Sequence, residues 1–154
     1  MEMNHRWDIQ RASLNDAPMI AQFQVDMALE SEGTELNFEL VLKGVSEGIN
    51  DESKGIYLVA RNENNEIIGS LLITREWSDW RCTWYWWIQS VYVRPEYRRQ
   101  GVYREMYYKV KILAQEAQVH CLKLYADRNN KPALSTYTSL GMKESHYLLF
   151  EEEI

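Results

Sequence analysis

The sequence has no long hydrophobic run. Its 154 residues contain no stretch of about 18 consecutive apolar residues, so no membrane-spanning helix is expected. The first residues are charged from Glu2 onward, which excludes the apolar core of a secretion signal. With 45% hydrophobic residues the chain is ordinary for a globular protein, and we expect a single domain over residues 1–154.

Cysteine and histidine are also scarce. The only two cysteines, Cys82 and Cys121, have no partners at a spacing typical of zinc sites, and we expect two reduced thiols that are buried or half-buried. The three histidines lie far apart in the sequence, which gives no indication of a metal site. Reduced thiols and the lack of a leader point to the cytoplasm.

A broad excess of basic residues is absent. The chain has 23 acids and 17 bases, and six of the bases fall within residues 94–111, where only two acids occur. A nucleic-acid-binding protein would show a wider basic surface. The pattern instead predicts one local anion site, and the acidic remainder favours a cationic second ligand.

The hydrophobic pattern predicts a mixed α/β fold with a largely antiparallel central sheet flanked by helices, in the order β-α-α-β-β-β-α-β-α-β. Helices are expected from residue 15, where Asn-Asp-Ala-Pro is typical of a helix start, at about 37–47, from 102, and at 131–140. The residues 75–81 are expected to form a loop. The expected strands are residues 7–13, 55–61, 67–74, 82–93, 121–126 and 146–152.

The stretch VYVRPEYRRQGVYR (91–104) places three arginines around one glycine, between a strand and a helix. The first N–H groups of a helix have no internal acceptor and favour anions. Gly101 lets a ligand approach the backbone closely, and Arg98, Arg99 and Arg104 would add positive charge. The glycine-rich phosphate loop of nucleoside triphosphatases, G-x-x-x-x-G-K-[ST], is absent. The glycine-rich motif of dinucleotide-binding Rossmann folds is absent too, because this turn has a single glycine. On local evidence, a solvated basic turn is an equal alternative.

Two motifs together resemble the GNAT family of N-acetyltransferases. The family pattern [QR]-x-x-G-x-[GA] matches at Arg98 and Gly101 and departs at Tyr103, where a small residue is usual. The pattern N-x-x-A-x-x-x-Y-x-x-x-G-[FM] matches throughout, from Asn130 through Tyr137 to Met142. The expected order of elements is similar to that fold over the whole chain.

The resemblance implies acetyl-CoA as the acetyl donor and an amine as the acceptor. Backbone amides of residues 100–104 would cradle the pyrophosphate, and backbone groups near Val91 and Val93 would pair with the pantetheine arm, where an N–H could also polarise the thioester oxygen. Asn130 would contact the same arm. The resulting cofactor-binding set is Val91, Val93, Arg98, Arg99, Gln100, Gly101, Val102, Tyr103, Arg104 and Asn130.

The family pattern also places Tyr137 near the sulfur, as the general acid for the departing thiolate. The general base stays open between Glu76 and Asp79, with Glu30, Glu32 and Glu35 as further acids. Some family members that acetylate polyamines have a glutamate where this chain has Gln89, an amide that cannot take up a proton. Gln89 could still orient a substrate or a water.

Five tryptophans crowd residues 77–87. Trp77 and Trp80, in the expected loop, would suit an amine cation together with Glu76 and Asp79, with Glu32 and Gln89 also bordering the acceptor. A cap on the sheet or a dimer contact is an equally weighted alternative.

The expected function is acetyl transfer from acetyl-CoA to a primary amine by direct attack in a ternary complex. The amine could belong to a small molecule or a peptide, and a homodimer is compatible with the sequence. Two alternatives stay open: a non-catalytic acyl-CoA-binding or sensor module, and an aromatic-cage protein that binds amines.

Overall fold

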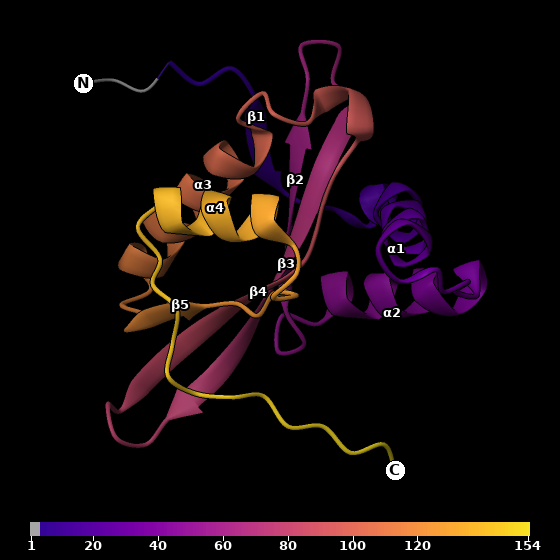
Figure 1. Cartoon of the computed structure of the whole chain (residues 1–154). Helices are drawn as coiled ribbons and strands as arrows, with labels where there is room; N and C mark the ends of the chain where they lie inside the picture. The colour runs from indigo at the N-terminus through magenta and orange to yellow at the C-terminus, as the bar shows by residue number, and fades with distance from the viewer. Residues whose placement is uncertain (1–3) are drawn as a thin grey trace. The chain divides into compact units, whose positions relative to one another are not determined.

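The computed structural model describes residues 4–154. The chain divides into two compact units, one ending at Leu124 and one comprising Tyr125–Ile154. The first unit contains the sheet and three helices, and the second contains one helix (Figure 1).

The first unit is built on a five-stranded sheet. Its strands lie in sequence order, and all neighbours are antiparallel except the last pair, which is parallel. The strands are β1 (Asp8–Arg11), β2 (Ile56–Arg61), β3 (Ile67–Ser78), β4 (Thr83–Val93) and β5 (Cys121–Lys123).

One face of this sheet is covered by α1 (Ala17–Glu32) and α2 (Phe38–Asn50) (Figure 1). The helix α1 begins after a short 3-10 turn (Leu14–Asp16), has Pro18 in its first turn and ends at Gly33 in the left-handed conformation. Ile20 and Phe23 of α1 belong to the same core cluster as Tyr92 of β4. All three side chains are at most 7% exposed.

The other face is covered by α3 (Val102–Glu116). Its apolar side chains recur every fourth residue, as expected for a helix that packs on one side. Val102, Met106 and Val110 are at most 2% exposed, and the Met106 methyl lies directly over Gly69 of β3.

The second unit contains α4 (Lys131–Ser139). The Asn130 side chain caps it by accepting a hydrogen bond from the Ala133 amide at 3.3 Å. Gly141 follows the helix with φ of +95°, as is common after a helix end.

The mixed α/β fold with a largely antiparallel sheet is confirmed, but the expected loop at 75–81 is wrong. The strand β3 continues to Ser78 and pairs rung by rung with β4, so Trp77 lies opposite Trp84. Backbone hydrogen bonds to β4 hold Arg75 and Glu76 in the strand even though both are charged. The polar composition of residues 75–81 therefore predicted the end of the strand too early, because β3 continues to Ser78.

The expected strand at 146–152 is also wrong, because these residues form no ladder with any described strand. Tyr147, Leu148, Leu149 and Phe150 are 60–87% exposed. Consecutive apolar residues predict a strand only if neighbouring strands supply hydrogen bonds. The strand expected at 121–126 is shorter for the same reason, ending at Lys123. The expected burial of the two cysteines is wrong as well, because Cys82 lies in the turn before β4 and Cys121 at the start of β5, and both are exposed.

Among residues 4–154, no helix has the length and apolar character that crossing a membrane requires.

We expect Met106→Ala to destabilise the protein by about 2–5 kcal/mol, because it removes a fully buried side chain between α3 and the sheet. Denaturant unfolding followed by far-UV circular dichroism measures the change. Ile112→Ala, on the same helix but 44% exposed, is the matched control and should change stability by about 0.5 kcal/mol or less. Equal effects of the two variants would contradict this description of the core.

Candidate functional site

The strand β4 separates from β5 partway along its length. It pairs with β3 almost to its end, but it pairs with β5 only over three rungs, Tyr85 to Trp87 opposite Cys121 to Lys123. From Ile88 to Val93, therefore, one edge of β4 has no strand beside it within residues 4–124. Such an edge presents N–H and C=O groups that an extended ligand can use.

A bulge interrupts β4 in this free section. The register with β3 shifts between Ser70 opposite Tyr92 and Leu72 opposite Gln89, and Ser90 has φ of +53°. A bulge re-aims backbone groups and is often found next to active sites. The N–H and C=O groups around Val91 lie in this irregular segment.

A sharp turn then joins β4 to α3. A 3-10 turn (Pro95–Tyr97) is followed by Arg99 at φ +62° and Gly101 at φ +82°, both left-handed. No side chain of residues 4–154 caps the N-terminus of α3, and a Cβ at Gly101 would meet none of their atoms within 4 Å. The first turn of α3 thus combines amides that no described side chain caps, a positive dipole end and open space at Gly101, which suits a phosphate group.

The turn is braced from the N-terminal segment. The Trp7 indole donates a hydrogen bond to the Gln100 carbonyl at 3.2 Å and packs edge-on against Tyr97 with ring centroids 5.7 Å apart. The Gln100 side chain donates to the Glu96 carbonyl at 2.9 Å. These contacts hold the Gln100 and Glu96 carbonyls of the turn.

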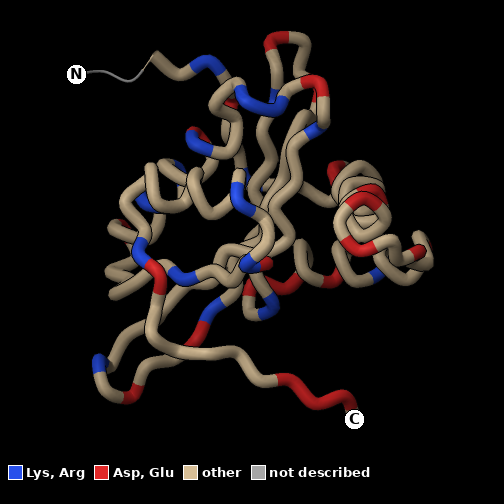
Figure 2. Tube along the Cα trace, in the orientation of Figure 1, with Lys and Arg blue, Asp and Glu red and all other residues tan. Residues whose placement is uncertain are grey.

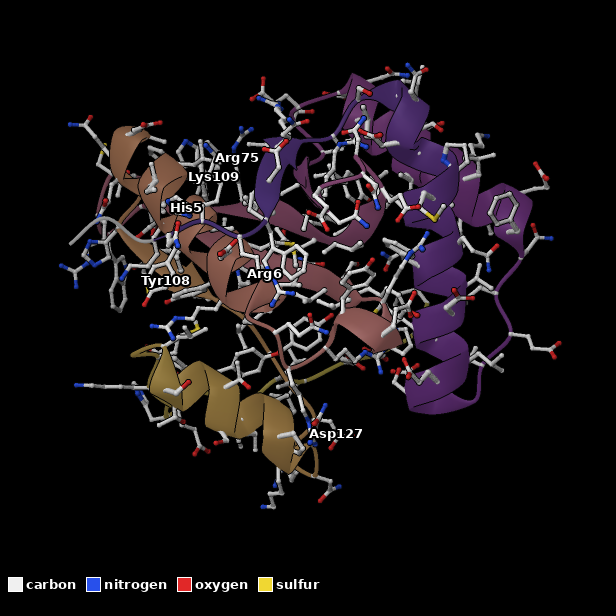
Figure 3. The ribbon with its side chains drawn as sticks, turned by 90° about the horizontal axis from the view of Figure 1, so that it is seen from above. His5, Arg6, Arg75, Tyr108, Lys109 and Asp127 are labelled. Carbon is white, nitrogen blue, oxygen red and sulfur yellow. The ribbon has the colours of Figure 1, made fainter. Side chains whose placement is uncertain are left out.

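Glu105, in the first turn of α3, accepts backbone hydrogen bonds from Arg6 and Trp7, both at 2.9 Å. Its carboxylate is therefore used by the N-terminal segment. Figure 3 shows His5 and Arg6 of that segment beside α3 and near Tyr108. A shallow surface hollow next to the turn is lined by His5, Gly101, Arg104, Glu105 and Tyr108.

Basic residues gather along the turn before α3 (Figure 2). The three arginines of this turn differ in their contacts. Arg98 forms a two-pronged ion pair with Glu30 of α1, at 2.7 and 2.8 Å. Arg99 and Arg104 have no ion pair with any acid of residues 4–154, and Arg104 lies over the Tyr108 ring at 5.7 Å. Arg99 and Arg104 are therefore the arginines available to an anion.

Tyr103, the departure from the family pattern, lies along α3. Its ring is 6.2 Å from that of Tyr107, one helical turn further on, and its side chain is half-buried. The small residue usual at this position is thus replaced by a side chain that packs against the helix and leaves the space beside Gly101 open.

Glu76 lies on the sheet face that also carries Trp87 and Lys123. Its carboxylate accepts a hydrogen bond from the Trp87 indole at 2.9 Å and pairs with the Lys123 ammonium at 3.4 Å. That ammonium lies 4.1 Å from the Tyr85 ring centroid. The chain thus forms an acidic and aromatic cage around an ammonium group, and its own Lys123 fills it.

The same face includes Gln89, opposite Leu72 in the ladder, whose amide donates to the Thr74 hydroxyl at 2.6 Å. Trp77 points to the other face, where it packs edge-on against Trp84 with ring centroids 4.9 Å apart. Alternation along β3 therefore separates Trp77 from Glu76. Asp79 and Trp80 lie in the hairpin turn, with Trp80 87% exposed, so the structure does not gather the expected pocket of Trp77, Trp80, Glu76 and Asp79.

Glu32 is the last residue of α1 and is exposed. In the second unit, Asn130 uses its side-chain oxygen to cap α4, and Tyr137 lies on the same helix. Burial raises the pKa of Tyr137 above the ordinary tyrosine value, so its hydroxyl keeps its proton at neutral pH.

Sequence reasoning missed Trp7, Glu105 and Lys123. Trp7 and Glu105 are almost one hundred residues apart, and only the pairing of β1 with β2 and the packing of α3 bring them together. The signal available was weak: a tryptophan just before a strand, and an acid in the first turn of a helix. Among residues 4–154, no group of three or more metal-binding side chains occurs.

A model of the acetyltransferase (GNAT) family matches residues 17–142. The chain therefore belongs to the GNAT family of acetyltransferases, whose members generally use acetyl-CoA. No match was found among curated proteins.

Solved structures agree with this family. A possible acetyltransferase from Clostridium difficile 630 is 36% identical, with a TM-score of 0.89, over 97% of this chain and 99% of that one. An aminoglycoside acetyltransferase from an uncultured soil metagenomic sample is 20% identical, with a TM-score of 0.80, over 99% of both chains. A ribosomal-protein-alanine N-acetyltransferase from Brucella melitensis is 16% identical, with a TM-score of 0.78, over 96% of this chain and 99% of that one. The last two likenesses show the fold alone.

The Arg98 guanidinium lowers the pKa of Glu30 by donating hydrogen bonds to its carboxylate. A carboxyl group with a depressed pKa keeps its ion pair above the ordinary pKa and loses it as the pH falls through the depressed value. We therefore expect Arg98→Gln to raise the pKa of Glu30 toward its ordinary value. Carboxyl-carbon NMR titration measures this change.

Asp51 provides an internal control, because hydrogen bonds from Ser53 lower its pKa without any contribution from Arg98. Its titration should be the same in both proteins. An unchanged pKa of Glu30 in the variant would show that the ion pair does not form in solution.

Proposed function

We propose that this protein transfers an acetyl group from acetyl-CoA to a primary amine, by direct attack of the amine within a ternary complex. One observation carries the proposal: the free edge of β4 leads directly into the uncapped N-terminus of α3, through a turn with two left-handed residues. An extended arm that ends in a pyrophosphate is the ligand shape that fits this arrangement.

In this proposal the pyrophosphate lies against the amides of Gln100 to Arg104, with Arg99 and Arg104 adding charge. The open space beside Gly101 supports a close backbone approach. Backbone groups of Val91 and Val93 pair with the pantetheine arm, and an N–H in the bulged segment polarises the thioester carbonyl. Acetyl-CoA supplies the activated acetyl group as a thioester. Asn130 would contact the arm with the part of its amide that does not cap α4.

The chemistry requires a neutral amine, a stabilised tetrahedral intermediate and a protonated thiolate. The amine nitrogen bonds to the carbonyl carbon, and the carbon–sulfur bond then breaks. Tyr137 gives its proton to the departing sulfur; its hydroxyl, whose pKa burial raises, carries that proton at neutral pH. No covalent enzyme intermediate is needed.

The acceptor amine is proposed to bind on the sheet face of Glu76, Trp87 and Gln89. The position of the Lys123 ammonium supports this assignment, because it shows that the cluster accommodates a cationic nitrogen. Glu76 is the better candidate for the general base, since Asp79 lies in the exposed hairpin turn. Glu32 and Trp80 stay proposed as outer contacts of the acceptor, whereas Trp77 lies on the other face of the sheet and is not part of this arrangement.

A non-catalytic acyl-CoA-binding module is the second candidate. It is favoured by the polar groups of the acceptor face, because Gln89 is hydrogen-bonded to Thr74 and Glu76 to Lys123. The two functions are separated by a thiol-release assay with acetyl-CoA and a broad panel of small and peptidic amines. Binding of acetyl-CoA without any thiol release would favour the binding module.

We expect Gly101→Glu to abolish acetyl-CoA binding, measured by isothermal titration, because it places a carboxylate and a side chain in the proposed pyrophosphate site. Gly33→Glu is the matched control: Gly33 also has a positive φ and open space around it, at the end of α1. It introduces the same charge and a comparable backbone strain away from the turn. Equal loss of binding in both variants would argue against this site.

We expect Tyr137→Phe to lower kcat by about 10²- to 10⁴-fold, because the thiolate loses its proton donor. The acetyl-CoA dissociation constant should change by no more than about twofold, since only a hydroxyl is removed. Steady-state kinetics and titration measure the two quantities. Tyr147→Phe, at a tyrosine that is 73% exposed, is the control. An unchanged kcat in Tyr137→Phe would exclude the tyrosine as the general acid.

A further inference from the structure

The Arg98 side chain joins three segments that are far apart in the sequence. Its Nε donates a hydrogen bond to the Val93 carbonyl at 2.8 Å, at the end of β4. Its two terminal nitrogens donate to both oxygens of Glu30 in α1. The guanidinium also lies 5.4 Å from the ring centroid of Tyr92, whose own ring packs against Phe23 of α1.

In these contacts the planar guanidinium of Arg98 donates hydrogen bonds in several directions at once. All three of its nitrogens donate within the protein, and its positive charge is balanced by the Glu30 carboxylate. A guanidinium with this geometry is held in place, whereas a phosphate ligand needs donors that face the ligand. The neighbouring Arg99 and Arg104 have no such partner among residues 4–154.

The backbone next to Arg98 requires such an anchor. Arg99 has φ of +62°, a conformation that an L-residue with a long side chain adopts only when its surroundings hold it there. On the other side of the turn, Trp7 holds the Gln100 carbonyl. Arg98 and Trp7 thus fix the turn from its two ends, before any ligand arrives.

We propose that Arg98 is a positioning residue: through Val93 and Glu30 it holds the turn 98–101 in the anion-binding conformation and links it to α1, and it does not itself contact the anion. The inference deepens the proposed function and rests on it for the identity of the anion. It assigns the charge contribution to Arg99 and Arg104 instead. It also makes Glu30, on a helix of the opposite sheet face, part of the support of the proposed cofactor site.

The first test is hydrogen exchange of the ligand-free protein, which does not depend on acetyl-CoA. The amides of Tyr97 and Arg98 donate to Arg94 and Pro95 within the turn. We expect their exchange to be about tenfold faster in Arg98→Lys, since a lysine keeps the charge but lacks the planar guanidinium. Arg99→Lys should leave these rates unchanged. Unchanged exchange in Arg98→Lys would overturn the inference.

The second test is the direction in which Glu30→Gln changes acetyl-CoA binding. A positioning role predicts weaker binding by about tenfold, because the turn loses its link to α1. If Arg98 were a phosphate ligand restrained by Glu30, the same variant would bind acetyl-CoA more tightly, and the inference would fail. Glu39→Gln, at an exposed acid in the first turn of α2, removes the same charge without touching the pair and should leave the dissociation constant unchanged.

The third test is the ionic-strength dependence of acetyl-CoA binding in Arg98→Gln. A positioning role predicts weaker binding with an unchanged salt dependence, whereas loss of a phosphate contact would flatten it. If the native protein does not bind acetyl-CoA, the proposed function fails, and the exchange rates of the ligand-free protein still decide whether Arg98 holds the turn.

Discussion

The unequal pairing of β4 is the constraint on which the candidate site depends. Hydrogen bonds to β3 hold this strand almost to its end, while β5 accompanies it for only three residues. The strand therefore stays extended through a section where one edge has no partner strand within residues 4–124, and this section ends at Val93, before the turn to α3. If β5 continued alongside, the backbone groups of that section would be used up within the sheet.

The turn after β4 is held by side chains from distant parts of the chain. Trp7 reaches it from the N-terminal segment, and Glu30 reaches it through Arg98 from α1. A helix N-terminus binds an anion best when its amides already point in the right direction, because no ordering cost is then added to binding. The hydrogen bond from Trp7 and the Arg98–Glu30 ion pair thus preorganise this turn for binding.

The sheet face that carries Glu76, Trp87 and Gln89 has side chains that could serve either to stabilise the fold or to bind the acceptor amine. Glu76, Trp87 and Tyr85 surround the Lys123 ammonium much as an amine-binding site would surround its ligand. The cluster stabilises the chain through one ion pair at the point where β4 and β5 part. An incoming amine has to compete with Lys123 for Glu76 or bind beside it, toward Gln89.

Much of this protein could be predicted from local sequence signals. Hydrophobic periodicity located three of the helices and the five sheet strands that the structure describes, because a helix or strand that packs on one side must repeat its apolar residues. Pro132 and Gly141 marked the ends of the fourth helix, α4. The spacing of Arg98, Gly101, Asn130 and Tyr137 indicated the family. Local signals failed for Arg75 to Ser78, where the ladder with β4 overrides a polar composition, and for residues 146–152, whose apolar run finds no strand partner.

The sequence by itself determined the family, the uncapped helix start and the glycine that leaves it open. Only the tertiary structure decided which arginine faces which partner. Arg98 and Arg99 are neighbours with the same chemistry, and nothing local distinguishes them. The packing of α1 places Glu30 within reach of one and not of the other, because contacts across 68 residues are set by the sheet and not by the chain around them.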